Sequence, residues 1–296
     1  MSEVVDVKVD AKAYRSEEKP TWCPGCGDFG ILASLTQALV GLNLFPHQVL
    51  LVSGIGCGSK VPYYMRANGY DSLHGRALPV ATGAKLGNHD LKVVVISGDG
   101  DGYGIGGNHF VHTMRRNPDL THIVENNQVY GLTKGQYSPT SPKGYIGGTS
   151  PEGAIEVQTN PIALAVAGGA TFVARGFAGD PKHLTQTIMK ALRHKGYSLV
   201  DILQPCVTYN KINTYDWYKE RVYKLDDEPG YDPSNYGAAW EKAKEWEERI
   251  PIGVIYQEEG RPTYEEQVSQ LRERPLNRQS VHQDRDVLES IKREFL

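Results

Sequence analysis

The chain has 296 residues, of which 40% are hydrophobic and 23% are charged, and its formal net charge is −3. This length is enough for one large α/β domain, or for one domain with an appendage. Because a near-neutral chain offers no basic face, we do not expect nucleic acid as a partner. No apolar run reaches the roughly 20 residues of a membrane span, and the start lacks the apolar core of a signal peptide. We therefore expect a cytoplasmic protein without a membrane partner.

Short β-branched runs alternate with helix-like stretches between Trp22 and Cys206. The predicted strands are Gln48–Ser53, Lys92–Ser97, Thr121–Glu125, Ala170–Ala174 and Ser198–Leu203. The predicted helices are Phe29–Val40, Arg76–Leu86, Gly107–Arg116, Asn160–Gly168 and Pro181–His194. This alternation predicts an α/β fold with a mostly parallel sheet flanked by helices. In such a sheet, ligands bind beyond the carboxyl ends of the strands.

The two ends of the chain differ in character from its middle. Residues 1–20 are polar and predict an N-terminal arm, which precedes a main domain at residues 21–209. Residues 210–296 are rich in charges, Tyr and Trp, and they contain few apolar runs. We interpret them as a C-terminal extension that wraps the same domain or a neighbouring subunit. Within it, Ala238–Ile250 is predicted to form a charged surface helix.

A segment rich in glycine and aspartate, Gly98–Asn108, directly follows the central predicted strand. Backbone N–H groups freed by glycine, together with the next helix N-terminus, can bind phosphate oxygens. Acidic side chains repel phosphate unless a cation lies between them, so Asp99 implies Mg²⁺. Asn127 follows the next strand, which would aim both side chains at one ion. Without a ligand, the same residues would form two ordinary turns.

The four cysteines all fall in predicted loops or turns. Cys23 and Cys26 form a C-x-x-C unit, whereas Cys57 and Cys206 each follow a predicted strand. In a reducing compartment, four cysteines are better metal ligands than disulfide partners. Four thiolates hold either Zn²⁺ or a [4Fe–4S] cluster. Zinc sites usually pair two C-x-x-C units and this chain has one, but the spacing alone leaves both metals open.

Several motifs resemble the β subunit of 2-oxoacid:ferredoxin oxidoreductases, the thiamine-diphosphate-binding family of pyruvate:ferredoxin oxidoreductase. Between about residues 20 and 225, in chain order, they are CPGCG, SGIGC, HGRALPVATG, GDGDGYGIGGNHF, NNQVYGLTKGQYSPTS and PCVTYNKINTYDWY. The resemblance implies a thiamine-diphosphate-binding fold. It assigns a [4Fe–4S] cluster to Cys23, Cys26, Cys57 and Cys206, and Mg²⁺ to Asp99, Asn127 and the Val129 carbonyl. The family commonly has Met-Asp where this chain has Glu125-Asn126, which leaves the role of Glu125 open.

Further residues are predicted to surround thiamine diphosphate and the substrate. The predicted cofactor-binding residues are Ile55, Gly56, Ser59, His74, Gly98, Asp99, Gly100, Asp101, Asn127, Val129, Gly131 and Leu132. Lys60, Arg76 and Lys134 are the predicted catalytic contacts. Lys60 would reach the substrate carboxylate, and Arg76 would bind a carboxylate or a phosphate. The alternative for Lys60 is a solvated lysine, and the alternative for Arg76 is a surface or interface ion pair.

The activity that the resemblance implies is the oxidative decarboxylation of a 2-oxoacid, with coenzyme A and ferredoxin as further substrates. The products would be acyl-CoA, CO2 and reduced ferredoxin. The chain would act in a heterodimer, because the family's α subunit provides the carboxylate that activates thiamine diphosphate. Two alternatives remain open: a thiamine-diphosphate decarboxylase or dehydrogenase subunit without a cluster, and a non-catalytic Cys₄ zinc scaffold. The residues do not select among pyruvate, 2-oxoglutarate and other 2-oxoacids.

Overall fold

The structure is a computed structural model that describes residues 8–280, 282 and 284–295. One eight-stranded sheet dominates it, in the order β2-β1-β3-β4-β8-β7-β10-β9. These strands are β1 (Val49–Ser53), β2 (Asn68–Asp71), β3 (Lys92–Gly98), β4 (Leu120–Asn126), β7 (Phe172–Phe177), β8 (Tyr197–Leu203), β9 (Val222–Lys224) and β10 (Ile250–Gln257). Neighbours run parallel except for β7 and β10. The predicted α/β class with a mostly parallel sheet is therefore confirmed.

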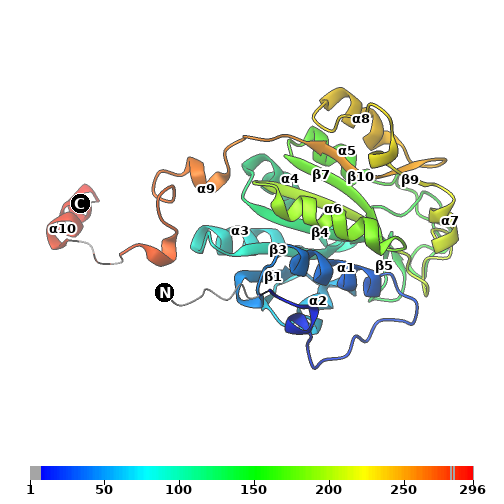
Figure 1. The fold of residues 1–296 in the computed structure, drawn as a ribbon, viewed down its shortest axis with the longest axis horizontal. Coiled ribbons are helices and arrows are strands. Elements are labelled where there is room, and N and C mark those ends of the chain that lie inside the picture. The colour runs from blue at the N-terminus through cyan, green and yellow to red at the C-terminus, as the bar shows by residue number, and fades with distance from the viewer. Residues whose placement is uncertain (1–7, 281, 283, 296) are drawn as a thin grey trace.

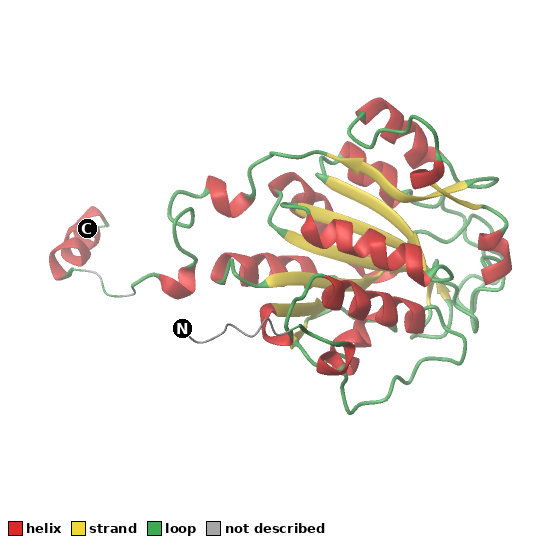
Figure 2. Cartoon of the chain, in the orientation of Figure 1, coloured by secondary structure: helices red, strands yellow, loops and turns green. Residues whose placement is uncertain are grey.

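Helices cover both faces of this sheet (Figure 2). They are α1 (Asp28–Gly41), α2 (Val61–Tyr64), α3 (Ala77–Gly87), α4 (Gly107–Arg116), α5 (Pro161–Ala167), α6 (Pro181–Arg193), α7 (Tyr215–Lys219), α8 (Tyr236–Lys244), α9 (Tyr264–Gln267) and α10 (Arg285–Glu294). The core against α1 and α6 contains Leu51 and Val94, whereas the core against α3, α4, α5 and α8 contains Val52 and Val93. Consecutive strand residues thus bury on opposite faces, as a central parallel sheet requires. None of the helices in the described part of the chain is long and apolar enough to cross a membrane.

The predicted surface helix Ala238–Ile250 is wrong at its carboxyl end. Helix α8 stops at Lys244, because the backbone of Glu245 turns to an extended conformation. Ile250 instead begins β10, which is buried along nearly all its length and pairs antiparallel with β7. The extension therefore contributes β9 and β10 to the main sheet, while the predicted boundary at residue 209 stays a prediction. The short polar edge strand β2 was also not predicted.

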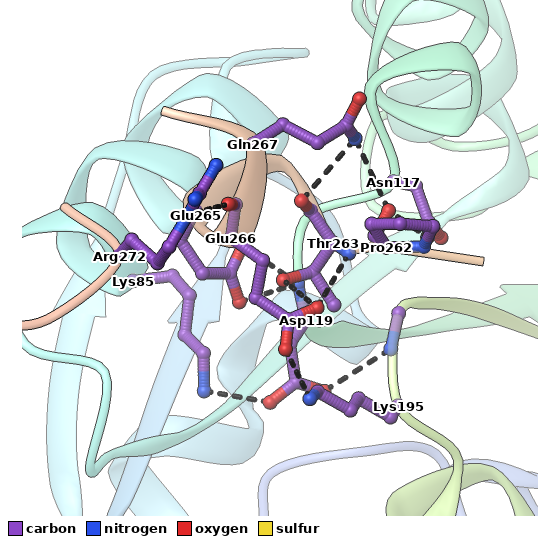
Figure 3. Close-up of polar contacts among 11 residues, drawn as sticks. Lys85, Asn117, Asp119, Lys195, Pro262, Thr263, Glu265, Glu266, Gln267 and Arg272 are labelled. Atoms are coloured by element: carbon purple, nitrogen blue, oxygen red, sulfur yellow. Dashed lines mark hydrogen bonds and ion pairs between the residues drawn. The ribbon is translucent and has the colours of Figure 1, made fainter. Parts of the chain in front are cut away.

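The segment around α9 holds the extension against the amino ends of the central strands (Figure 3). The carbonyl of Asn117, just before β4, accepts the backbone N–H of Tyr264 at 3.1 Å, and its side chain donates to the Pro262 carbonyl at 3.2 Å. The backbone N–H of Asp119 donates to Glu265 at 3.3 Å. These contacts lie at the edge of the sheet opposite the carboxyl ends of the strands. Figure 1 shows the same arrangement, with α9 and α10 on the side away from the short strand β5 (Val129–Tyr130).

His122 lies in the middle of β4 and is fully buried. Its Nε2 lies 2.7 Å from the Ser97 hydroxyl, and its Nδ1 lies 2.9 Å from the Tyr197 hydroxyl. Burial lowers the pKa of His122 to about 3, well below the ordinary value of about 6.5. As pH falls below about 6.5 the unfolded chain takes up this proton first, so the free energy of unfolding decreases. The stabilisation is fully present above that pH and is lost towards pH 3.

We expect His122→Gln to remove this part of the pH dependence. Between pH 7 and pH 5, the wild-type chain should lose about 2 kcal/mol more of its free energy of unfolding than the variant does. Denaturant titrations at the two pH values measure the difference. His47→Gln, which changes an exposed histidine, serves as the control. Parallel pH profiles for the wild-type chain and His122→Gln would contradict the assignment.

Candidate active site

A cavity of about 140 Å³ opens at the carboxyl ends of β1, β3 and β4. Ligands are expected at this edge of a parallel sheet. The predicted cofactor-binding residues that line it are Ile55, Gly56, His74, Gly98, Asp99, Gly100, Asp101, Asn127, Val129, Gly131 and Leu132. The structure therefore brings together eleven of the twelve residues of that prediction, all except Ser59.

Asp99 stands at the turn from β3 into a π-helical segment, Gly100–Ile105. Its side chain is buried, and the hydroxyls of Ser138 and Thr140 both donate to the same carboxylate oxygen, Oδ2, at 2.5 Å each. Burial raises the pKa of Asp99 to about 6, against the lowering effect of these two hydroxyls. A bound cation would favour the charged form. The two hydroxyls thus fix Oδ2 of the carboxylate, and neither of them binds Oδ1.

Two further candidate oxygen ligands lie in the turn after β4, the side-chain oxygen of Asn127 and the carbonyl of Val129, which accepts the backbone N–H of Gly131 at 3.0 Å. The side-chain oxygen of Asn127 accepts the backbone N–H of Val129 at 3.1 Å, and both residues line the cavity beside Asp99. The hydroxyl of Tyr130 donates to the Gly100 carbonyl at 2.9 Å, which ties this turn to the one after β3. A carboxylate, an amide oxygen and a backbone carbonyl are the hard ligands that Mg²⁺ takes. These residues fit the predicted ion.

Asp101 connects three loops around the cavity. Its Oδ1 accepts the backbone N–H of Gly75 at 2.7 Å and that of Ile55 at 3.0 Å, and it lies 2.9 Å from His74 Nδ1. A Cβ atom added at Gly54 would lie 1.9 Å from Asp101 Oδ2, so this position requires glycine. The cofactor contact assigned to Asp101 stays a prediction, and the structure adds that its Oδ1 accepts hydrogen bonds from protein groups.

All four cysteines line a second cavity, of about 200 Å³. Two of them lie close to Gly131, because the sulfurs of Cys206 and Cys57 are 3.7 and 3.8 Å from the place of a Cβ atom on this residue. All four are free thiols. Within residues 8–280, 282 and 284–295, no three side chains of His, Cys, Asp or Glu lie close enough to hold one metal ion. The sulfurs thus surround a space without converging on one point.

This cysteine cavity suits a group larger than a single ion. In a [4Fe–4S] cluster four thiolates hold a multi-iron core, whereas a tetrahedral zinc needs four sulfurs at about 2.3 Å from one centre. Burial raises the pKa of Cys57 to about 11 and raises the pKa of Cys26 further. Metal binding would therefore have to release protons from these thiols. The four residues fit the predicted cluster in kind, and all of them line one cavity.

The two cavities share a wall. Cys57, Asn127, Gly131 and Leu132 line both of them. Ligands bound in the two cavities would therefore be neighbours, on either side of residues from the turns after β1 and β4.

A buried carboxyl pair beside this wall was not predicted. Asp28, at the start of α1, and Glu125, near the end of β4, are each 1% exposed. Burial raises the pKa of Glu125 well above its ordinary value, and the charge of the Asp28 carboxylate raises it further. Burial also raises the pKa of Asp28 to about 6. A Cβ atom at Gly58 would lie 1.6 Å from Glu125 Oε2, so glycine makes room for this side chain. No pattern in the sequence connects residues so far apart.

Four of the predicted catalytic and cofactor-binding residues lie outside the first cavity. Lys60 lines the cysteine cavity, where its Nζ donates to the Thr21 hydroxyl at 3.4 Å. Arg76 is exposed and donates to the Gly75 carbonyl at 3.3 Å. Lys134 is exposed, and Ser59 is buried. The substrate and cofactor contacts assigned to these four residues stay predictions.

Other residues of the site escaped the sequence analysis. Tyr130, Gly58 and Thr133 line the first cavity. Ser138 and Thr140 hold Asp99. The string SPTS at residues 138–141 was available as a signal, because hydroxyl side chains at alternate positions can both reach one acceptor.

Two family models match this chain. The model "Thiamine pyrophosphate enzyme, C-terminal TPP binding domain" matches residues 47–202, which include the turns after β1, β3 and β4. The model for the carboxyl-terminal part of the pyruvate ferredoxin oxidoreductase beta subunit matches residues 206–273, which include β9 and β10. The first of these covers more than half of the chain. Thiamine pyrophosphate is another name for thiamine diphosphate.

Similar proteins agree with the two models. The chain is 50% identical over 279 residues to the 2-oxoacid:ferredoxin oxidoreductase subunit beta of Saccharolobus solfataricus, covering 90% of each chain. It is 49% identical over 267 residues to subunit beta of 2-oxoacid:ferredoxin oxidoreductase 1 of Aeropyrum pernix, covering 87% of this chain and 84% of that one. A solved 2-oxoglutarate:ferredoxin oxidoreductase from Magnetococcus marinus, with 2-oxoglutarate, coenzyme A and succinyl-CoA bound, superposes with a TM-score of 0.89 at 40% identity over 96% of each chain. The chain therefore belongs to the β-subunit family of the 2-oxoacid:ferredoxin oxidoreductases.

Proposed function

We propose that this chain, together with an α subunit, catalyses the oxidative decarboxylation of a 2-oxoacid to acyl-CoA and CO2, with ferredoxin as electron acceptor. The observation that carries the proposal is the wall shared by the two cavities. One cavity is lined by Asp99, Asn127 and Val129, the proposed ligands of a magnesium–diphosphate site, and the other is lined by all four cysteines. When bound, thiamine diphosphate supplies a carbon nucleophile for the ketone, and a [4Fe–4S] cluster supplies a one-electron acceptor.

The residues of this chain bind and orient rather than carry out the bond changes. Asp99, Asn127 and the Val129 carbonyl would hold Mg²⁺ against the diphosphate. The backbone N–H groups around Gly100 would receive its oxygens. Glycine at position 100 is needed, because a Cβ atom there would lie 2.2 Å from the ring of Tyr130.

Apolar side chains at the mouth of the first cavity support the need for a partner subunit. Ile55 and Leu132 line this cavity, yet their exposed fractions are 42% and 46%. Leu73, beside the cavity residue His74, is 78% exposed. We propose that these exposed apolar side chains belong to a protein interaction site. An α subunit docked here would close the cavity and bring the carboxylate that activates the cofactor.

The proposal predicts that the chain is inactive alone and active with its partner. We expect no 2-oxoacid-dependent ferredoxin reduction from the purified chain supplied with thiamine diphosphate, Mg²⁺ and coenzyme A. Addition of the α subunit should restore the reaction, measured anaerobically as ferredoxin bleaching. Full activity of the chain alone would refute the half-site proposal. Analysis for iron, sulfide, zinc and thiamine separates the alternatives, since thiamine without iron indicates a cluster-free enzyme and zinc without thiamine indicates a scaffold.

A further inference from the structure

The side-chain amide of Gln204 lies against the sulfur of Cys26. Gln204 directly follows β8, and its backbone N–H donates to the Asn126 carbonyl at 3.0 Å, which fixes it at the carboxyl edge of the sheet. The side chain is 1% exposed, and its Nε2 donates to Cys26 Sγ at 3.1 Å. Gln204 also lines the cysteine cavity. A buried amide donor is thus in direct contact with one of the four predicted cluster ligands.

The surroundings fix the position of this amide. A Cβ atom on Gly27 would lie 2.8 Å from Gln204 Cγ, so the glycine lets the side chain pass beneath the C-x-x-C turn. Nε2 also approaches the Pro205 carbonyl at 3.4 Å, whereas Oε1 has no hydrogen-bond partner among the described residues. The two acceptors, Cys26 Sγ and the Pro205 carbonyl, thus both lie near Nε2 of the amide. A thiolate at Cys26 would repel Oε1 and attract the N–H group, which favours the same orientation.

We propose that Gln204 raises the reduction potential of the cluster by donating this hydrogen bond to Cys26. The inference rests on the proposed function, which provides the cluster. Hydrogen bonds to the sulfurs are one of the factors that set the potential of an iron–sulfur cluster. Reduction adds one electron and increases the negative charge that the sulfurs share, so an N–H donor stabilises the reduced state more than the oxidised state. Gln204 thereby makes the cluster a better acceptor for electrons from the neighbouring cavity.

The test compares the cluster potential of the wild-type complex with that of variants at position 204. Gln204→Met keeps the length of the side chain and removes the donor. We expect the equilibrium between reduced and oxidised cluster to shift roughly tenfold towards the oxidised form, which is about 59 mV for one electron. Gln204→Leu, which also removes the donor, should lower the potential by a similar amount. An anaerobic redox titration followed by electron paramagnetic resonance measures both, and Gln37→Met, on the exposed side of α1, is the control.

A second measurement uses the wild-type complex alone. The iron–sulfur stretching bands in its resonance Raman spectrum should shift in deuterated buffer, since the amide proton exchanges. An iron-loaded Gln204→Met complex with the wild-type potential would overturn the inference, and so would Raman bands that do not respond to deuterium. Either result leaves the proposed function in place. A wild-type complex without iron would remove the proposed function and this inference together.

Discussion

Replacing Asp99 with asparagine is expected to weaken the binding of thiamine diphosphate and Mg²⁺ by more than about 100-fold. Loss of a residue that only supports a metal ligand already costs about 10- to 100-fold, and Asp99 is proposed to contact the ion itself. The variant keeps the shape of the side chain, and its amide oxygen can still accept the hydroxyls of Ser138 and Thr140. What it loses is the negative charge that holds the ion against the diphosphate.

Two further variants sharpen this prediction. Thr140→Val removes one of the two hydroxyls on Asp99 Oδ2 and should weaken cofactor binding by about 10-fold. Asp232→Asn, in an exposed turn, should leave it unchanged. Calorimetric titration of the αβ complex with thiamine diphosphate in the presence of Mg²⁺ gives the affinities. Wild-type affinity in Asp99→Asn would show that the metal is held elsewhere.

Cys57→Ser should stop the transfer of electrons to ferredoxin. Serine is a poor substitute for a thiolate ligand of iron, and Cys57 lies on the wall between the two cavities. We expect most of the iron to be lost and the rate of ferredoxin reduction to fall on the order of 100-fold or more. The loss of a residue that only supports a metal ligand costs about 10- to 100-fold, and the loss of a ligand should cost more. Iron analysis and the rate of ferredoxin reduction in the anaerobic complex measure both effects.

Trp22→Phe is a milder change at the same place. The indole N–H of Trp22 donates to the Cys57 carbonyl at 2.7 Å, so this variant disturbs the backbone of Cys57 and keeps its sulfur. It should retain the cluster. Unchanged iron content and ferredoxin reduction in Cys57→Ser would show that this cysteine is not a ligand.

Local patterns in the sequence were enough to predict the central strands and the turns that follow them. The run Val93–Ile96 is apolar at every position, which identifies a strand buried on both faces. Because parallel strands end at one edge, the glycine-rich turn at Asp99 and the turn at Asn127 were expected to meet. The first cavity confirms that these two residues lie together.

Features that depend on contacts across the chain were not predictable in this way. Strand β10 carries Pro251 and Gly253, both of which disfavour a strand, yet pairing with β7 and β9 makes it one. The proximity of Asp28 and Glu125 connects the first helix with the fourth strand, and only the packing of α1 against the sheet brings them together. The amide of Gln204 faces Cys26 for the same reason, since 178 positions separate the two residues.

We infer that a magnesium-bound thiamine cofactor and an iron–sulfur cluster occupy neighbouring cavities of this chain. A crystal structure of the anaerobically purified αβ complex, with diffraction data at the iron absorption edge, tests it most directly. We predict one strong anomalous peak among Cys23, Cys26, Cys57 and Cys206, and density for a diphosphate with its ion between Asp99 and Asn127. An iron peak elsewhere, or a cofactor that does not touch Asp99, would show that the two groups do not occupy these cavities.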